Sequence, residues 1–358
     1  MAKKPKVLIY QPVDESGASH KKLEEAGAEV KLGVRTSWEK GQANVRGQTV
    51  EFMLDPDTIV ACGVANRATT ITEKSIRNAP DLRMVCKYTV GFDNVDVDAA
   101  TKAGVIVVHS PTECNWGGVA EGTMANILAM LKKVREKDRS VKAGEWRDPA
   151  LQGYFLGRRQ DGYAGLTLGI IGLGRIGSRL ADLFQPWRVR ILAYDPYVDE
   201  SKFVHHNATP VDMDTLLRES DIVTIHTNLT RETNKLIGAT ELGKMKKNAI
   251  LVNAARGPIV DIDALFDVLD KDHIAGAALD VLPDEPPDPQ LPILGLGDKV
   301  LLSPHMIANT INGGLKEAIP WVTKAVIDVL KGEVPRHVVN EDVLPLWRQK
   351  FAGKSLIG

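Results

Sequence analysis

Arg256, Glu285 and His305 are the side chains whose types and order in this chain could do chemistry together. Each follows an apolar run, so each is expected where a buried strand ends. The planar guanidinium of Arg256 could hold a carboxylate through two parallel hydrogen bonds, and the His305 imidazole could give or take a proton near neutral pH. A carboxylate such as Glu285 favours the protonated ring and fixes its orientation. Any one of them alone is more often a surface or structural residue, but together they fit proton transfer on a carboxylate-bearing substrate.

A glycine-rich segment, GLGRIG, separates a strand-like run from a helical pattern at residues 172–177. In a dinucleotide site the first glycine permits a tight turn, the second lets the backbone approach the pyrophosphate, and the third lets the helix pack on its strand. The phosphates then face the positive end of the helix. The spacing alone is a weak signal, which its place between strand and helix strengthens. The contacts predicted here are Gly172, Gly174, Arg175, Ile176 and Gly177.

Asp195 ends the next strand-like run, about 20 residues after the glycines, as expected of the acid that binds the adenine ribose. Its carboxylate would accept hydrogen bonds from ribose hydroxyls and repel a 2′-phosphate. No Lys or Arg follows Asp195 before Lys202. We therefore expect NAD (NADH) rather than NADP. We expect His226, at the end of another strand, to line the adenine pocket.

The second half of the chain alternates near-continuous apolar runs with helical segments. Strands of this kind are buried on both faces of a parallel sheet, so the pattern predicts a doubly wound α/β domain. Helices are expected over 213–219 and 261–270. The expected strands are 166–172, 188–195, 220–227, 248–255, 273–280 and 299–305.

The first hundred residues show a second alternation of the same kind, followed by a longer helix from Val119 to Ala143. The chain closes with a helix over 314–331 and a polar tail. We therefore expect a nucleotide domain of residues 110–306 inserted into a smaller domain of residues 1–109 and 307–358. In the smaller domain, strands are expected at 6–11, 28–32, 57–63 and 82–88, and helices at 20–27 and 72–79, the latter capped by Thr72.

The composition sets limits on the function. The 358 residues suit two domains at about 150 residues each, and the net charge of -1 gives no basic excess for nucleic acid. No apolar run approaches the ~18 residues of a membrane helix, and the N-terminal apolar stretch is too short for a signal peptide. The three cysteines lack metal-ligand spacing, so we expect no metal and a reducing, cytoplasmic location.

GLGRIG, AYDPY, NAARGPIVD, GAALDVLPDEP and SPH, in that order, resemble the NAD-dependent D-2-hydroxyacid dehydrogenase family, as do residues 90–107 and 119–131. The resemblance covers nearly the whole chain. It implies an α/β protein in which a Rossmann-type doubly wound nucleotide domain is inserted into a flavodoxin-like substrate domain. The active site would lie in the cleft between the two domains.

The resemblance also implies what the residues do in a reversible hydride transfer between NADH and a 2-keto acid. Arg256 would clamp the substrate carboxylate, His305 would be the general acid and base, and Glu285 would tune His305. The helix from Val119 would help form a homodimer. Further contacts implied by the family pattern are Val90 and Gly91 to the substrate, through their backbone N–H groups, and Thr123 and Asp280 to the cofactor.

Several residues depart from the family pattern near the substrate. The loop 86–89 usually holds small residues or an Arg, whereas this chain has Lys87 and Tyr88. We expect these two, and Arg67, to favour a substrate with a polar or anionic tail. The alternative that they pack structurally stays open, above all for Arg67. The other departures are Trp116, Gly122 and Ile307.

Two other functions fit the same fold. One is a dinucleotide-sensing binding protein like the C-terminal-binding-protein corepressors, which ranks lower because no targeting run beyond Lys3 and Lys4 and no long disordered tail are visible. The other is a methyltransferase that uses the same glycine loop. The Arg–Glu–His set argues against that chemistry, which needs no carboxylate clamp paired with a proton donor.

Overall fold

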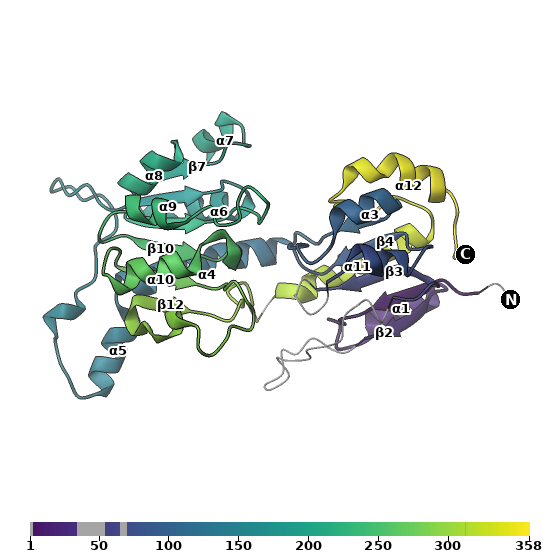
Figure 1. Ribbon diagram of the computed structural model, residues 1–358, viewed down its shortest axis with the longest axis horizontal. Coiled ribbons are helices and arrows are strands. Elements are labelled where there is room, and N and C mark those ends of the chain that lie inside the picture. The colour runs from purple at the N-terminus through teal and green to yellow at the C-terminus, as the bar shows by residue number, and fades with distance from the viewer. Residues whose placement is uncertain (1–2, 34–53, 65–69, 312) are drawn as a thin grey trace. The chain divides into compact units, whose positions relative to one another are not determined.

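The computed structural model describes residues 3–33, 54–64, 70–311 and 313–358. These residues form two compact units, of which unit 1 comprises Met1–Asn115 and Asn309–Gly358 and unit 2 comprises Trp116–Ala308 (Figure 1). The chain therefore passes between the units twice. Arg67 lies outside the described residues. No helix among the described residues is both long and apolar enough to cross a membrane.

Unit 1 is built on a five-stranded parallel sheet in the order β2-β1-β3-β4-β5. This order is that of flavodoxin-like domains, which confirms the predicted fold class. The strands are β1 (Lys6–Ile9), β2 (Glu29–Leu32), β3 (Thr58–Gly63), β4 (Met84–Lys87) and β5 (Ile106–Val108).

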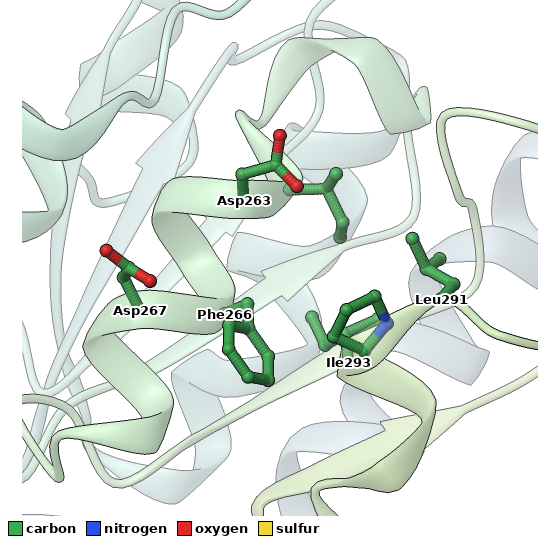
Figure 2. Close-up of a pocket in the computed structure, with 7 residues that line it drawn as sticks. Asp263, Phe266, Asp267, Leu291 and Ile293 are labelled. Atoms are coloured by element: carbon green, nitrogen blue, oxygen red, sulfur yellow. The ribbon is translucent and has the colours of Figure 1, made fainter.

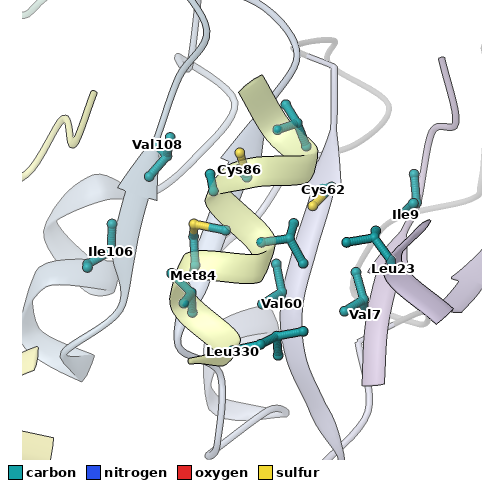
Figure 3. Packing of buried hydrophobic residues seen from close by; sticks show 14 of the residues in the cluster. Val7, Ile9, Leu23, Val60, Cys62, Met84, Cys86, Ile106, Val108 and Leu330 are labelled. Carbon is teal, nitrogen blue, oxygen red and sulfur yellow. The ribbon is translucent and has the colours of Figure 1, made fainter. Parts of the chain in front are cut away.

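Both faces of this sheet are buried, because alternate residues of each strand enter two separate cores. Val7 and Ile9 face the core under α1 (Ala18–Glu25) and α11 (Ala318–Leu330), as Figure 3 shows around Met84 and Leu330. Leu8 and Tyr10 face the other core, under α2 (Glu73–Arg77) and α3 (Val97–Ala103). As predicted, Thr72 caps α2.

Unit 2 is built on a seven-stranded sheet in the order β12-β11-β10-β9-β6-β7-β8. The chain starts in the middle of the sheet at β6, proceeds to one edge, and then returns to fill the other side, as in a Rossmann domain. The strands are β6 (Thr167–Ile171), β7 (Arg190–Tyr194), β8 (Thr209–Pro210), β9 (Ile222–Ile225), β10 (Ile250–Asn253), β11 (Gly276–Leu279) and β12 (Val300–Leu302).

Helices cover both faces of the second sheet. One core contains apolar side chains of α4 (Glu113–Leu131), α6 (Arg175–Phe184) and α7 (Glu200–His205). The other core contains those of α8 (Met213–Glu219), α9 (Ala239–Lys244) and α10 (Ile262–Asp270). The doubly wound prediction is confirmed.

The prediction of one helix from Val119 to Ala143 is wrong. The structure has α4, which ends at Leu131, and a separate α5 from Val134 to Lys142. Lys133 between them has a φ of 51°, a left-handed conformation that interrupts a right-handed helix. No residue of α5 is buried, which fits the change from apolar to charged sequence at this point.

The sequence pattern predicts only a polar tail after residue 331, whereas the structure has a further helix there, α12 (Leu344–Phe351). Trp347 is fully buried in the core of unit 1. Its indole N–H donates to the carbonyl of Arg83 at 3.0 Å. Leu344 and Phe351 pack against the same core, so the three apolar residues follow the i, i+3, i+7 spacing of a helix. This short pattern was missed in the sequence.

Candidate active site

The three side chains predicted to react together follow three neighbouring strands of unit 2. Arg256 follows β10, Glu285 follows β11 and His305 follows β12, and these strands are adjacent and parallel. Parallel strands end at one edge of the sheet, which is where ligands bind in such folds. His305 Nδ1 lies 2.7 Å from Glu285 Oε2. The structure therefore joins the predicted acid–base pair directly.

Arg256 is held beside this pair by a tight packing of loops. The buried Asn253 accepts a hydrogen bond from the Ala255 amide at 3.0 Å and donates one to the Arg256 carbonyl at 2.9 Å. Any side chain at Gly257 would overlap the backbone of Leu282. The Leu282 amide in turn donates to Glu285 Oε1 at 3.1 Å. No role was predicted for Asn253 or Gly257 from the sequence. Their position close to Arg256, at the end of an expected strand, could have indicated one.

The charges around Glu285 favour its ionised form. Burial by itself raises the pKa of this carboxyl, but the hydrogen bond and charge of His305, the Leu282 amide and the charge of Arg256 outweigh burial and lower it. Arg256 and His305 are therefore both electrostatic neighbours of one carboxylate. The side chains of His305 and Glu285 are 43% and 35% exposed, so the pair is open to a ligand.

Asp280 fixes the segment that carries His305. His305 has a φ of 54°, an uncommon left-handed conformation that needs support for a residue other than glycine. Its amide donates to the Asp280 carbonyl at 2.8 Å. The Asp280 carboxylate accepts hydrogen bonds from Ser303 Oγ at 2.6 Å and from the Met306 and Ile307 amides. Although these donors act against it, burial raises the pKa of Asp280.

Gly122 and Ile307, two departures from the family pattern, lie against each other. A Cβ atom at Gly122 would overlap the Ile307 side chain and lie 2.7 Å from the Ile307 carbonyl oxygen. Ile307 thus occupies the space that a side chain on α4 would need. The bulk of Ile307, two positions after His305, compensates for the missing side chain at Gly122.

The glycine loop has the conformation of a phosphate site. Gly172 has a φ of 94°, which residues with a side chain rarely adopt. Gly174 faces open space and begins α6 without a side-chain cap. The free N–H groups at such a helix start attract anions. Arg175 is exposed and Ile176 half-buried on the first turn, while Gly177 lets the Gly172 carbonyl approach closely.

Asp195, His226 and Thr123 also have features of a dinucleotide site. Asp195 accepts hydrogen bonds from the Leu173 amide at 2.8 Å and the Tyr197 amide at 3.0 Å, which fixes its carboxylate next to the glycine loop. Among the described residues, the buried His226 Nδ1 and Thr123 Oγ1 have no hydrogen-bond partner. Loss of solvation lowers the pKa of His226 to about 3, so its ring stays neutral. Unpaired buried polar atoms are rare, and a bound nucleotide would supply partners.

The predicted carboxylate-binding loop of unit 1 follows β4. Val90 and Gly91 are half-buried, and their amides donate to no acceptor among the described residues. Two such amides in one turn can receive the oxygens of a carboxylate. The geometry is compatible with the predicted contact.

Lys87 and Tyr88 are buried within unit 1. Lys87 is fully inaccessible, and its ammonium donates to Tyr10 Oη and to the Val64 carbonyl, both at 2.7 Å. Burial lowers the pKa of Lys87 from 10.5 to about 7 and raises that of Tyr88 well above its usual value. Lys87 thus has internal partners, and its predicted contact with substrate stays a prediction.

A hollow elsewhere on unit 2 contains none of the predicted site residues. It has a volume of about 180 Å³ and lies between α10 and residues 291–293. Figure 2 shows Asp263, Asp267 and Phe266 of α10 on one side, and Leu291 and Ile293 on the other. Among the described residues, no three His, Cys, Asp or Glu side chains are arranged to hold a metal ion.

The contact between Gly122 and Ile307 can be tested by a double-mutant cycle. Gly122→Ala should lower the free energy of unfolding by about 1–3 kcal/mol, because the added methyl overpacks the site. Ile307→Ala alone leaves a void. The double variant should lose at least ~1 kcal/mol less than the two single losses together, measured by urea unfolding. Additive losses would show that the Ile307 side chain is not what excludes a side chain at Gly122.

The burial of Lys87 makes a prediction about pH. Between pH 7 and 10.5 the unfolded chain holds a proton on Lys87 that the folded chain releases, so this residue lowers stability most at or below pH 7 and least near pH 10.5. Lys87→Met removes that dependence. Its melting temperature relative to the parent should therefore be higher at pH 6 than at pH 9.5. Parallel curves for the two proteins would contradict the burial, and Lys102→Met controls for the loss of one exposed lysine.

Comparisons with known proteins identify the family of the chain. The model of the D-isomer specific 2-hydroxyacid dehydrogenase NAD-binding domain matches residues 124–307. The chain is 37% identical over 342 residues to a glyoxylate reductase of Thermofilum pendens, covering 95% of this chain and 96% of that protein. It is 35% identical over 335 residues to a D-3-phosphoglycerate dehydrogenase of Archaeoglobus fulgidus, covering 94% of this chain but 59% of that protein.

Solved structures give the same result. A D-lactate dehydrogenase from Aquifex aeolicus, complexed with NAD and lactic acid, is similar with a TM-score of 0.77 and 28% identity, covering 92% of this chain and 96% of that one. The fold, the cofactor site and the sequence matches point to one assignment. The chain belongs to the D-isomer-specific 2-hydroxyacid dehydrogenase family, and it is an NAD-dependent oxidoreductase of 2-hydroxyacids.

Proposed function

We propose that this enzyme interconverts a small 2-keto acid and its 2-hydroxy acid, with Arg256, Glu285 and His305 as the catalytic residues. The observation that carries the proposal is the 2.7 Å contact of His305 with Glu285, together with the charge of Arg256 beside the same carboxylate. The relatives named glyoxylate reductase make glyoxylate the first keto acid to test.

In the proposed reduction, Arg256 binds the substrate carboxylate through its planar pair of donors. Glu285 holds His305 Nδ1, which leaves Nε2 to face the keto oxygen. NADH supplies the hydride when bound. His305 Nε2 gives its proton to the keto oxygen as negative charge develops there, and in the reverse direction it removes the hydroxyl proton. Glu285 stabilises the charged ring at the start of the reduction.

We propose that unit 2 holds the cofactor at the carboxyl end of its sheet. The α6 N-terminus faces the pyrophosphate through Gly174, Asp195 binds the ribose hydroxyls, and the neutral His226 lines the adenine pocket. Asp280 acts near the nicotinamide end, since it fixes the His305 segment. The remaining proposed contacts are Gly172, Arg175, Ile176, Gly177 and Thr123.

We propose that unit 1 supplies the substrate contacts. The amides of Val90 and Gly91 are the proposed donors to the substrate carboxylate. Lys87 and Tyr88 bound the same loop from inside the domain, so they set its shape and can bias it toward polar substrates. No contact with nucleic acid is part of this function.

We also propose a homodimer formed through the segment that follows α4. Its apolar side chains are largely exposed in the single chain: Trp146 is 75% exposed, Val134 54% and Phe155 52%. Several large apolar side chains exposed on one segment support a protein interface there, and sedimentation of the intact chain tests whether it is a dimer. Three unpaired cysteines fit a reducing location, the cytoplasm.

The role of Arg256 separates this proposal from a function without turnover. Arg256→Ala should lower kcat/KM for glyoxylate by about 10²–10⁴-fold, because the bidentate clamp is lost. Arg256→Lys keeps the charge without the fork and should fall between. Loss of NADH absorbance measures turnover, and NADH fluorescence should show unchanged cofactor affinity. An alanine variant with nearly parental kcat/KM would reject the clamp, and absence of turnover with bound NADH in the parent would favour the dinucleotide-sensing alternative.

A further inference from the structure

We propose that His109 is a positioning residue that aims the Gly91 amide at the substrate carboxylate. The inference rests on the proposed function, since it concerns the loop at Val90 and Gly91. His109 comes directly after β5, the neighbour of β4 in the unit 1 sheet, and the loop follows β4. The two segments therefore leave the same edge of the sheet side by side.

The His109 ring contacts the loop backbone directly. Its Nδ1 lies 2.9 Å from the carbonyl oxygen of Val90. A carbonyl oxygen can only accept a hydrogen bond, so Nδ1 carries the hydrogen in this contact. The side chain is half-buried, which strengthens the bond relative to one in open water.

The bonded carbonyl and the Gly91 N–H belong to one peptide unit. Because that unit is planar and trans, its C=O and N–H point in opposite directions. Fixing the Val90 oxygen toward His109 therefore points the Gly91 N–H away from β5, with no acceptor for it among the described residues. Donation to the oxygen also polarises the peptide, so the N–H becomes a stronger donor.

Other hydrogen bonds fix the rest of the loop but not the Val90–Gly91 peptide. Ser110 Oγ donates to the Lys87 carbonyl at 2.8 Å, and the Ser110 amide donates to the Thr89 carbonyl at 3.1 Å. Thr89 Oγ1 donates to the Gly91 carbonyl at 2.8 Å. Among the described residues, His109 alone bonds to the Val90 oxygen. The orientation of the Val90–Gly91 peptide thus depends on this ring.

Aromatic neighbours fix the ring itself. Phe92 meets it edge to face with centroids 5.8 Å apart, and His337 meets it at 6.5 Å. The His109 amide donates to the His337 carbonyl at 3.3 Å. His337 is stacked on Trp321 at 4.8 Å and 12°. A ring packed on these sides has little rotational freedom, as a positioning residue requires.

The Gly91 amide would bind the substrate carboxylate, a group that does not change in the reaction, and this determines the expected kinetic effect of a His109 substitution. The Gly91 amide binds the same group in the bound substrate and in the transition state, so weakening it raises KM with little change in kcat. A defect in the catalytic set itself would instead lower kcat. The two cases can be told apart with one substrate titration.

The test compares two amide variants of similar polarity. The Asn side-chain nitrogen reaches the place of imidazole Nδ1, whereas the Gln nitrogen extends to the place of Nε2. His109→Asn should keep KM for glyoxylate within about twofold of the parent, and His109→Gln should raise it about five- to twenty-fold, the effect of one lost hydrogen bond. Both should keep kcat within about twofold and leave NADH affinity unchanged. Equal KM values for the two variants, or a matching fall in kcat, would overturn the proposal.

Two further measurements keep the result interpretable. Melting temperatures show whether either variant is misfolded, and affinity of the enzyme–NADH complex for oxamate, an unreactive keto-acid analogue, reports carboxylate binding without turnover. Oxamate affinity should fall in His109→Gln and not in His109→Asn, and equal affinities count against the role. Failure of the parent enzyme to reduce any 2-keto acid would instead refute the proposed function.

Discussion

The hydrogen bond between Glu285 and His305 is the interaction on which the account of this protein depends. It exists because β11 and β12 are adjacent and parallel, so the segments that follow them leave the same edge of the sheet. A carboxylate 2.7 Å from Nδ1 of an imidazole fixes the orientation of that ring before a substrate binds. Arg256 places a guanidinium next to the same carboxylate, and a guanidinium beside an oriented imidazole suits a keto acid.

Much of unit 2 serves to hold this edge in place. His305 adopts a left-handed backbone conformation, and Asp280 supports it from inside the sheet with a carbonyl and a buried carboxylate. Gly257 allows the Arg256 loop to lie directly on the backbone next to Glu285. Ile307 packs against α4 at Gly122, where there is no side chain. Glu285 and His305 are thus exposed, while Asp280 and Gly257, which position the two loops, are buried.

The sequence was most informative where a local pattern has a physical consequence of its own. Apolar runs that end in polar residues predicted the sheet edge, and the glycine spacing before Asp195 predicted the nucleotide loop. Less could be learned about contacts between distant segments. Nothing near Gly122 in the sequence indicates that Ile307 fills its space. The expectation that Lys87 lines the substrate pocket did not include its hydrogen bonds to Tyr10 and Val64 inside unit 1. The left-handed residue Lys133, which separates α4 from α5, has no distinctive sequence signal, because lysine is a common helix residue.

The turnover of Glu285→Gln with a keto acid tests the central claim most directly. Glu285 holds His305 Nδ1 at 2.7 Å with a charged acceptor, and the amide keeps the size of the side chain but weakens that contact. We expect kcat/KM for keto-acid reduction to fall by about 10–10³-fold, while NADH binding is unchanged. A kcat/KM equal to that of the parent enzyme would contradict the role of this pair.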